Sequence, residues 1–354
     1  MRTALAHPDA SIVVQQSNGK RLISVEPRGD LFIHIRECAT DYPLELIEHI
    51  LRVKTPAHLC DEIMRDEDPN YVQHDLYWSI LSYAGKEDFS GKQVLDFGSG
   101  CGASSMVLAR MFPDVKIVGV ELVPEFLELA QRRAKYHGIE DRVCFRRSPD
   151  SNSLPPDIGS FDYVLLVGVY EHLLPTERHT VLKLVWSHLK QGGIMFLIGT
   201  PYRWFPIDLH TTNLPLINYL PDGLALYYAR RFSKRVNRDV SWSELLRRGV
   251  RGGTPREIMT ILNRGGGRAE FLEPSHLGVK DRIDLWYKCS VIVVENSLVK
   301  SLTRWSKAGS GHGPDYGREY SPVKSLMKWS FRLVKAATGM TIVPDVSLAI
   351  RKVR

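Results

Sequence analysis

A glycine-rich turn between an apolar run and a helical segment is the feature that most constrains how this chain folds. The apolar run Val94–Phe97 includes an acid, Asp96, and leads into glycines at alternate positions from Gly98 to Gly102. Residues Ala103–Ala109 then have the composition of a helix. A buried strand that turns through glycines into a helix brings backbone N–H groups against a nucleotide-like ligand. Glycine suits such a turn because the backbone needs a positive φ and a side chain would block the ligand.

A second strand that ends in an acid follows the turn. The segment Lys116–Glu121 is typical of a short strand, and Pro124 is well placed as the first residue of a helix that ends at Gly138. An acid about 20 residues past the glycine turn, at the carboxyl end of the next strand, is where Rossmann-like folds hold ribose hydroxyls. We therefore predict that Glu121 contacts a ribose. The alternative is an exposed acid at the end of a strand.

The spacing of the glycines argues against two common ligand classes. The turn reads Gly-x-Gly-x-Gly rather than the Gly-x-Gly-x-x-Gly of dinucleotide-binding folds, which disfavours a nicotinamide-dependent oxidoreductase. No Gly-Lys-Ser/Thr follows, so the phosphate-binding loop of nucleotide hydrolases is absent.

From about residue 90 to residue 200 the chain resembles the class I S-adenosylmethionine-dependent methyltransferases, whose first motif has this acid-x-Gly-x-Gly-x-Gly form. Further segments carry the resemblance: Ser148–Asp150, Leu154–Pro155, Ser160–Leu166, Glu171–Leu173, and Leu189–Gly193 leading into Ile194–Ile198. The resemblance implies an α/β fold with a Rossmann-like, seven-stranded, mostly parallel sheet and helices on both faces. It implies S-adenosylmethionine as the cofactor.

The resemblance also implies how the cofactor is held. Backbone amides of the loop would bind the methionine part, and these belong to Gly98, Ser99, Gly100, Cys101 and Gly102. Asp96 would support the loop, Glu121 with its neighbour Leu122 would lie at the ribose, and Asp150 with Ser151 would lie at the adenine amine. Pro149 departs from the pattern, because the family usually has glycine there.

The rest of the chain divides into segments around this core. We expect an N-terminal hairpin and helical cap over residues 1–88, the cofactor-binding core over 89–200 and a substrate-side insertion over 201–266. Residues 267–354 would add a sixth strand, Arg268–Leu272, and an antiparallel seventh, Asp345–Val353, with a long basic helical excursion between them. Within that excursion, Ser310–Tyr320 is predicted to be flexible.

The charge of +7 is unevenly distributed. Lys and Arg concentrate in residues 230–256 and from residue 301 onward, which indicates a partner with anionic groups: a phosphorylated substrate, lipid headgroups or RNA. Solvated helix faces are the alternative. The helix expected over Ser321–Thr338 has its Lys and Arg on one face; we expect it to pack on its own domain, with peripheral membrane contact as the alternative.

The cysteines and the apolar runs indicate the cellular compartment expected for the chain. The five cysteines are scattered without a Cys-x-x-Cys pair, which favours reduced thiols in a cytoplasm over disulfides or a zinc site. Met1–Ala10 is too polar for a secretory signal, and no apolar run reaches the roughly 18 residues of a membrane span.

Two histidines are the candidate catalytic bases. A methyl sulfonium is already activated, so methyl transfer needs alignment and removal of a proton from the acceptor. His172 and His210 follow the fourth and fifth core strands, where such a base belongs, although a structural role is the alternative. Tyr202, Arg203 and Asp208 lie in the same aromatic and polar loop as His210 and are candidate substrate contacts. Glu171, His172 and Asp208 could alternatively hold a divalent metal, but their spacing does not compel it, and we predict no metal.

The function predicted from these features is O-methylation of a small-molecule or lipid-linked glycan hydroxyl, with a histidine as the general base. RNA methylation is an alternative supported only by the basic segments, and the lack of an RNA-binding module counts against it. A catalytically silent cofactor-binding subunit is another, although the glycine loop and Glu121 are intact. No Asn/Asp-Pro-Pro-Tyr/Phe motif occurs, which argues against base methylation of DNA.

Overall fold

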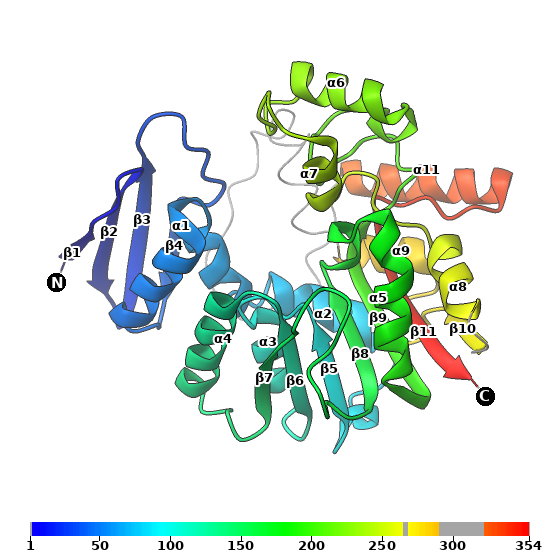
Figure 1. Ribbon diagram of the computed structural model, residues 1–354, viewed down its shortest axis with the longest axis horizontal. Helices are drawn as coiled ribbons and strands as arrows, with labels where there is room; N and C mark the ends of the chain where they lie inside the picture. The colour runs from blue at the N-terminus through cyan, green and yellow to red at the C-terminus, as the bar shows by residue number, and fades with distance from the viewer. Residues whose placement is uncertain (1, 265–267, 290–321, 354) are drawn as a thin grey trace.

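A seven-stranded sheet forms the centre of the computed structural model, which describes residues 2–264, 268–289 and 322–353 (Figure 1). Its strands lie in the order β10-β11-β9-β8-β5-β6-β7. They are β5 (Gln93–Phe97), β6 (Lys116–Glu121), β7 (Val143–Arg147), β8 (Phe161–Val167), β9 (Leu189–Pro201), β10 (Arg268–Leu272) and β11 (Asp345–Val353). Strands β5 to β9 are parallel, and β11 pairs antiparallel with both β9 and β10. The predicted α/β fold with an antiparallel last strand is confirmed.

Helices cover both faces of this sheet. Alternate strand residues point to opposite sides, so Val94 packs in one apolar cluster and its neighbour Leu95 in another. The first cluster takes in α2 (Val72–Leu81), α3 (Ala103–Met111) and α4 (Pro124–Tyr136). The second takes in α5 (Pro175–Ser187), α8 (Pro255–Asn263) and α11 (Pro322–Thr338), while α9 (Arg282–Cys289) contributes to both. Burial of both faces explains why the central strands are almost wholly apolar.

The N-terminal segment forms a separate four-stranded antiparallel sheet. Its strands are β1 (Arg2–Leu5), β2 (Ala10–Ser17), β3 (Lys20–Pro27) and β4 (Glu37–Thr40). The expected hairpin is present, because β2 and β3 pair across Asn18 and Gly19, both with positive φ. Helix α1 (Leu44–Glu67) follows and is kinked at Thr55, next to Pro56. The sheet extends beyond the hairpin that the sequence indicated.

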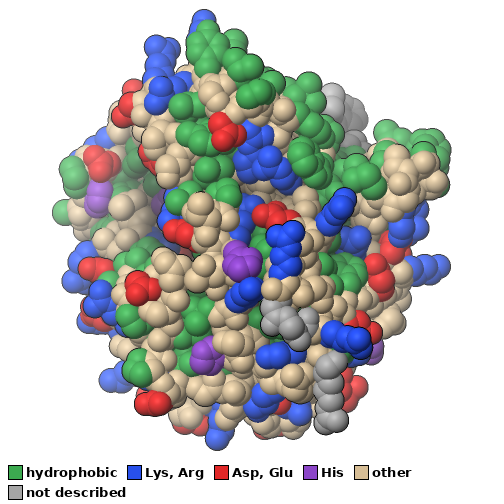
Figure 2. Space-filling model, turned by 45° about the vertical axis from the view of Figure 1, so that its right-hand side comes forward, with side chains coloured by type: hydrophobic (Ala, Val, Ile, Leu, Met, Phe, Trp, Pro, Cys, Tyr) green, Lys and Arg blue, Asp and Glu red, His purple; other side chains and the backbone are tan. Residues whose placement is uncertain are grey.

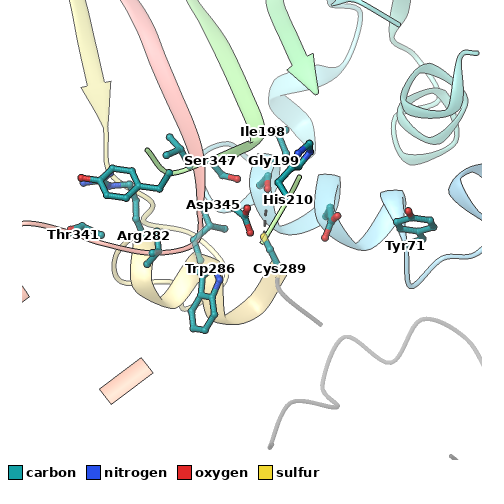
Figure 3. A pocket seen from close by; sticks show the side chains of 16 residues that line it. Tyr71, Ile198, Gly199, His210, Arg282, Trp286, Cys289, Thr341, Asp345 and Ser347 are labelled. Carbon is teal, nitrogen blue, oxygen red and sulfur yellow. Dashed lines mark hydrogen bonds between the residues drawn. The ribbon is translucent and has the colours of Figure 1, made fainter. Parts of the chain in front are cut away.

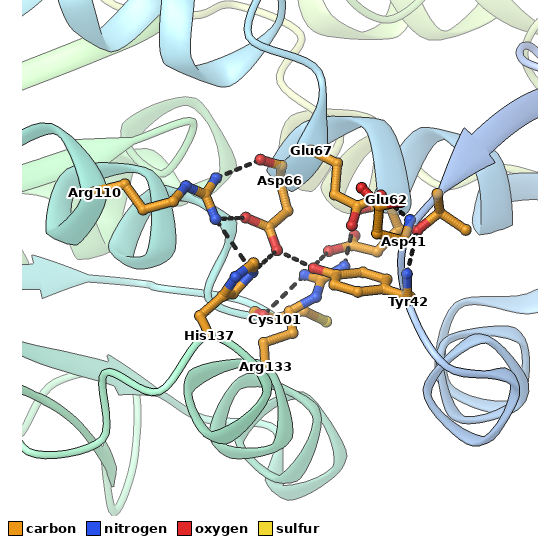
Figure 4. Close-up of polar contacts among 10 residues, drawn as sticks. Asp41, Tyr42, Glu62, Asp66, Glu67, Cys101, Arg110, Arg133 and His137 are labelled. Carbon is orange, nitrogen blue, oxygen red and sulfur yellow. Dashed lines mark hydrogen bonds and ion pairs between the residues drawn. The ribbon is translucent and has the colours of Figure 1, made fainter. Parts of the chain in front are cut away.

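A buried arginine joins α1 to the central domain (Figure 4). Arg133 of α4 is fully buried, and its guanidinium donates to the Glu62 carboxylate at 2.7 Å, the Glu62 carbonyl at 2.8 Å and the Cys101 carbonyl at 2.9 Å. Nearby, Asp66 of α1 pairs with Arg110 at 2.8 Å and with His137 at 2.9 Å. These contacts hold the N-terminal helix against α3, α4 and the glycine loop.

The segment after β9 packs above the carboxyl edge of the sheet. It contains α6 (Asp222–Phe232) and α7 (Trp242–Arg247), which share a small apolar cluster of their own. Thr254 caps α8 by accepting from the Glu257 amide at 3.1 Å. Hydrophobic side chains gather at the top of the face shown in Figure 2, the level at which α6 lies in Figure 1. Leu224, Tyr227 and Phe232 are the exposed apolar residues of α6.

Helix α5 is shorter than the chain's pattern suggests. The sequence favours a helix over residues 176–190 with Gly192 just past its end, but α5 ends at Ser187 and β9 begins at Leu189. Pairing with β8 recruits Leu189 into the sheet opposite Phe161. Gly192, with φ of 78°, lies inside β9 near an irregularity in this pairing rather than at a helix end.

The basic residues of α11 contact acids of the chain's own domain. Lys328 pairs with Asp284 at 2.8 Å, Arg332 also pairs with Asp284, at 2.7 Å, and Lys335 pairs with Asp281 at 3.0 Å. The apolar residues Leu326, Trp329 and Leu333 are exposed instead. Packing on the chain's own domain is thus confirmed. Ser321 and the stretch Ser310–Tyr320 lie outside the described residues, within which no helix is long and apolar enough to cross a membrane.

Replacing Arg133 with methionine should destabilise the protein by about 3 kcal/mol, because breaking one partner of a buried pair leaves an uncompensated charge. Burial raises the pKa of Glu62, and Arg133 with Lys54 more than offsets that rise, so loss of Arg133 removes the main interaction that opposes the cost of burying the carboxylate. Urea unfolding measures the effect. Arg132→Met is the matched control: Arg132 is 52% exposed and pairs with Glu128, which is also exposed, so a small change is expected. Equal losses in both variants would contradict this assignment.

Candidate active site

The glycine loop between β5 and α3 requires glycine for two separate reasons. Gly98, Gly100 and Gly102 have φ of 71°, 53° and 83°, in the left-handed region where a side chain is unfavourable. A Cβ on Gly98 would lie 2.7 Å from Val169, and one on Gly102 would lie 2.9 Å from the Ala130 side chain. A Cβ on Gly100 would meet nothing within 4 Å. The loop is therefore packed against the protein at its two ends and open at Gly100.

Most amides of this loop are bonded within the protein. The Gly98 and Ser99 amides both donate to the Val120 carbonyl, at 2.9 and 3.0 Å, and the Gly102 amide donates to the Ser99 carbonyl at 2.9 Å. The Gly100 amide donates to Glu121 Oε2 at 3.0 Å. Of the amides expected at a ligand, those of Gly98, Ser99 and Gly102 thus shape the loop, and the open side lies at Gly100.

Glu121 connects the loop to the next helix. Its Oε1 accepts from the Leu122 amide at 2.7 Å and the Val123 amide at 3.1 Å, at the start of α4, while its Oε2 holds Gly100. A carboxylate is favourable there because the first amides of a helix lack intrahelical partners. Glu121 therefore lies between the loop and the α4 N-terminus.

Asp96 supports the loop from below. The side chain is buried, and its Oδ2 accepts from Ser105 Oγ of α3 at 2.6 Å. Burial raises the pKa of Asp96 to about 6, and Glu121 adds to the rise. This contact ties the end of β5 to the first turn of α3, which agrees with a supporting role.

Asp150 and Ser151 lie in the turn after β7. The Ser148 amide donates to the Glu121 carbonyl at 2.9 Å, which keeps the end of β7 beside the end of β6. Asp150 is exposed, and its Oδ1 accepts from the Asn152 amide at 2.7 Å. The parallel sheet thus places Asp96, Glu121 and Asp150 after three neighbouring strands along one edge.

A carboxylate and two histidines meet after β8 and β9. His172 Nε2 lies 3.9 Å from Glu171 Oε1, and His210 Nε2 lies 4.0 Å from the same atom. Glu171 is buried, whereas both histidines are partly exposed. Burial lowers the pKa of His210, which favours its neutral ring. Both predicted histidines therefore lie together, and we call Glu171, His172 and His210 the histidine–glutamate cluster.

Asp208 does not belong to this cluster. Its Oδ1 accepts from the Thr211 amide at 3.2 Å, and its Oδ2 accepts from the Thr212 amide and hydroxyl at 2.8 and 2.7 Å. The metal set of Glu171, His172 and Asp208 considered from the sequence is therefore wrong, and His210 stands in place of Asp208. The bonds of Asp208 instead shape the loop that carries His210.

A cavity of about 310 Å³ opens beside His210 (Figure 3). Tyr202 and Gly199 line it from the end of β9, and Arg282 and Trp286 line it from α9. Arg203, by contrast, is not among its lining residues and packs its guanidinium 4.9 Å from the Trp204 ring. The cavity thus brings together the ends of β9 and β11 with α2 and α9.

Two carboxyl groups in this cavity were missed by sequence reasoning. Burial raises the pKa of Asp75 to about 7, with Asp345 adding to it, and burial likewise raises the pKa of Asp345 to about 7. Asp75 could have been found from the sequence, because it is an acid inside the apolar α2 segment. No sequence feature marks Asp345, because an acid at the start of a strand is ordinary and only the fold brings it to the cavity.

A model of the methyltransferase domain matches residues 94–193, which contain the glycine loop, Glu121, Asp150 and the first two members of the cluster. This segment belongs to the class I S-adenosylmethionine-dependent methyltransferases. The superfamily and its cofactor, S-adenosylmethionine, are thereby as predicted.

Named relatives match over a similar length of chain. A "Probable fatty acid methyltransferase" of Pseudomonas putida is 32% identical over 31% of this chain and 27% of its own. Erythromycin 3''-O-methyltransferase of Saccharopolyspora erythraea is 31% identical over 30% of this chain and 33% of its own. The matches thus span about a quarter to a third of these relatives. A solved O-methyltransferase family protein from Burkholderia thailandensis is 14% identical with a TM-score of 0.42, covering 73% of this chain and 76% of that one.

The carboxyl pair should make stability fall as pH rises. The folded state keeps protons on Asp75 that an unfolded Asp, with a pKa of 3.8, releases, so stability decreases between about pH 4 and pH 7. Asp75→Asn removes the titrating carboxyl group and with it this loss of stability at higher pH. The variant should therefore melt several degrees above the wild type at about pH 8 and close to it at about pH 4, as measured by circular dichroism.

Asp141→Asn is the control for this measurement, because Asp141 is exposed and remote from the cavity. It should leave the melting temperature nearly unchanged at both pH values. A gain from Asp75→Asn that is the same at both pH values would contradict the assignment.

Proposed function

We propose that this chain is a methyltransferase that uses S-adenosylmethionine to methylate a hydroxyl of a small-molecule or lipid-linked glycan acceptor. The observation that carries the proposal is the position of His210, which belongs to the histidine–glutamate cluster and also lines the cavity. A proton-accepting group thus stands where an acceptor would enter, at the same sheet edge as the glycine loop. We also propose the division into residues 1–88, 89–200, 201–266 and 267–354 as the functional units.

The loop and the strand ends suit the cofactor. The open space at Gly100 admits the methionine part, while Gly98, Ser99, Cys101 and Gly102 shape the loop around it. Glu121, beside Leu122, would accept from the ribose hydroxyls, and Asp150, beside Ser151, would accept from the adenine amine. When bound, S-adenosylmethionine supplies an activated methyl group at the edge where the cluster lies.

The cavity suits the acceptor. Tyr202 would contact it from the end of β9, and the carboxyl groups of Asp75 and Asp345, whose pKa burial raises to about 7, can donate to acceptor hydroxyls when protonated. Anionic groups of the acceptor would lie outside the cavity, toward Arg203 and the arginines of residues 230–256. Asp208 acts as a positioning residue, because its bonds hold the loop of His210.

The cluster removes the acceptor proton. The His172 Nδ1–H donates to the Arg247 carbonyl at 2.7 Å, and the His210 Nδ1–H donates to the Arg248 carbonyl at 3.2 Å, so the lone pair of each ring is at Nε2. As the acceptor oxygen gains the methyl group, its proton leaves toward these Nε2 atoms. Positioned bases of this kind contribute roughly a hundredfold to ten-thousandfold to rate.

A lipid-linked acceptor has further support from the surface. The exposed Leu224, Tyr227 and Phe232 of α6 would suit contact with a lipid chain. Named relatives include a protein described as a fatty acid methyltransferase. The cytoplasmic location expected from the sequence also belongs to this proposal.

Titration calorimetry with S-adenosylmethionine tests the cofactor site. Glu121→Ala should weaken binding about thirtyfold, because two hydrogen bonds to a charged acceptor are lost at a combined cost of about 2 kcal/mol. Glu125→Ala removes an exposed acid in the first turn of α4 and should leave binding unchanged. Equal affinities of Glu121→Ala and the wild type, with intact melting curves, would refute the ribose assignment.

His172→Gln and His210→Gln test the proton acceptor. Each should lower turnover of an acceptor found by screening hydroxylated glycans and lipids by about a hundredfold or more, with cofactor affinity retained. His188→Gln is the matched control, since His188 also contacts a backbone carbonyl, that of Gly159 at 2.7 Å, but lies at the opposite end of β8. Full turnover in both cluster variants would remove the cluster from the mechanism.

A further inference from the structure

We infer that Glu171, His172 and His210 form a binding site for one divalent transition-metal ion. One possible ligand atom from each side chain lies within 4.8 Å of the other two, and Glu171 Oε1 lies 3.9 Å from His172 Nε2 and 4.0 Å from His210 Nε2. Metal–ligand bonds of about 2.0–2.2 Å place neighbouring ligand atoms roughly 3–3.5 Å apart. The ligand atoms are therefore slightly farther apart than in a metal-bound site. Rotation of the two partly exposed histidine side chains suffices to bring them to the shorter separation.

Each histidine is already oriented as a ligand. The Nδ1–H groups donate to consecutive carbonyls, those of Arg247 and Arg248, at the end of α7. A backbone carbonyl on Nδ1 sets the tautomer that leaves Nε2 as a lone-pair donor, the arrangement found around metal-bound histidines. Both Nε2 atoms therefore point their lone pairs at the same carboxylate.

Glu171 is held in the same way. Its Oε2 accepts from Thr200 Oγ1 at 3.0 Å, which leaves Oε1 facing the histidines. The side chain is 1% exposed, and within the described ranges its ion-pair partners are the two histidines alone. A buried carboxylate needs a nearby cation, because burial in a low-dielectric interior is costly for an unpaired charge. A metal ion between these three side chains supplies that charge.

The backbone leaves room for this arrangement. Gly249 has φ of 99°, and a Cβ there would lie 2.7 Å from His210 Nδ1 and 3.4 Å from Glu171 Cγ. The α7 end can approach both side chains only because this residue is glycine. Gly249 therefore permits the carbonyl contacts that orient the histidines.

The ligand types indicate the class of ion. Two imidazoles and one carboxylate suit Zn²⁺, Fe²⁺, Co²⁺ or Mn²⁺, whereas Mg²⁺ and Ca²⁺ prefer oxygen ligands throughout. Three protein ligands leave at least one position open, and His210 borders the cavity. An acceptor hydroxyl could occupy that position, and coordination would lower its pKa. Activation of the acceptor hydroxyl by the ion rests on the proposed function, and it would replace direct transfer of the proton to an imidazole. Binding of the ion does not depend on the proposed function.

Cobalt titration of the full chain, after dialysis against a chelator, tests the site. Visible absorption of low-coordinate Co²⁺ and calorimetry with Zn²⁺ should both report one bound ion with micromolar or tighter affinity. Glu171→Gln and His172→Gln should each weaken binding at least tenfold. His188→Gln should bind as the wild type does, because His188 lies at the far end of β8.

The two proposals can fail separately. Absence of a saturable ion, or unchanged affinity in both Glu171→Gln and His172→Gln, would overturn the metal site whatever the cofactor result. Glu171→Gln is nearly isosteric and should fold. If this buried substitution nevertheless impairs folding, His172→Gln, at a partly exposed residue, tests the site instead. Metal binding without S-adenosylmethionine binding would support the site and overturn the proposed function.

Discussion

The hydrogen bonds of the buried Arg133 guanidinium are the contacts that fix the N-terminal helix against the central domain. Arg133 belongs to α4, yet its hydrogen bonds go to Glu62 of the N-terminal helix and to the carbonyl of Cys101 in the glycine loop. Few groups other than arginine could serve, because only its planar fork offers enough donors to satisfy a carboxylate and two carbonyls at once. One side chain thus couples the N-terminal cap to the loop beside the proposed cofactor site.

The site itself is built at the edge of the sheet by loops that are distant in the chain. The turns after β5, β6 and β7 bring Asp96, Glu121 and Asp150 into one row, and the loops after β8 and β9 bring Glu171 and His210 together. Parallel strands make this unavoidable, because all their carboxyl ends lie on the same side. The insertion after β9 then contributes the α7 carbonyls that orient the histidines.

Helix α11 illustrates why an amphipathic pattern does not reveal its orientation. Its Lys and Arg residues follow a helical period, which is equally compatible with a solvated face and with a face that meets acids. The acids are Asp281 and Asp284 at the start of α9, well apart in the chain, and they pair with the basic residues. The exposed Trp329 and Leu333 follow from the same docking.

The sequence by itself determined the core strands, the glycine loop and the two histidines placed after the fourth and fifth core strands, and the fold class followed from the resemblance that these segments carry. These follow from local signals: apolar runs, glycines where φ must be positive, and an acid at a strand end. It missed the N-terminal sheet beyond its hairpin, because β1 and β4 have only 4 residues each, too few for a clear alternating pattern.

Only the tertiary structure decided the composition of the site. In the fold His210, and not Asp208, lies beside Glu171, because the Asp208 carboxylate accepts hydrogen bonds from Thr211 and Thr212. The fold also brings Asp75 and Asp345 to one cavity. Spacing along a chain limits which side chains can meet, but packing across distant segments selects which of them face one another and which are shielded from water.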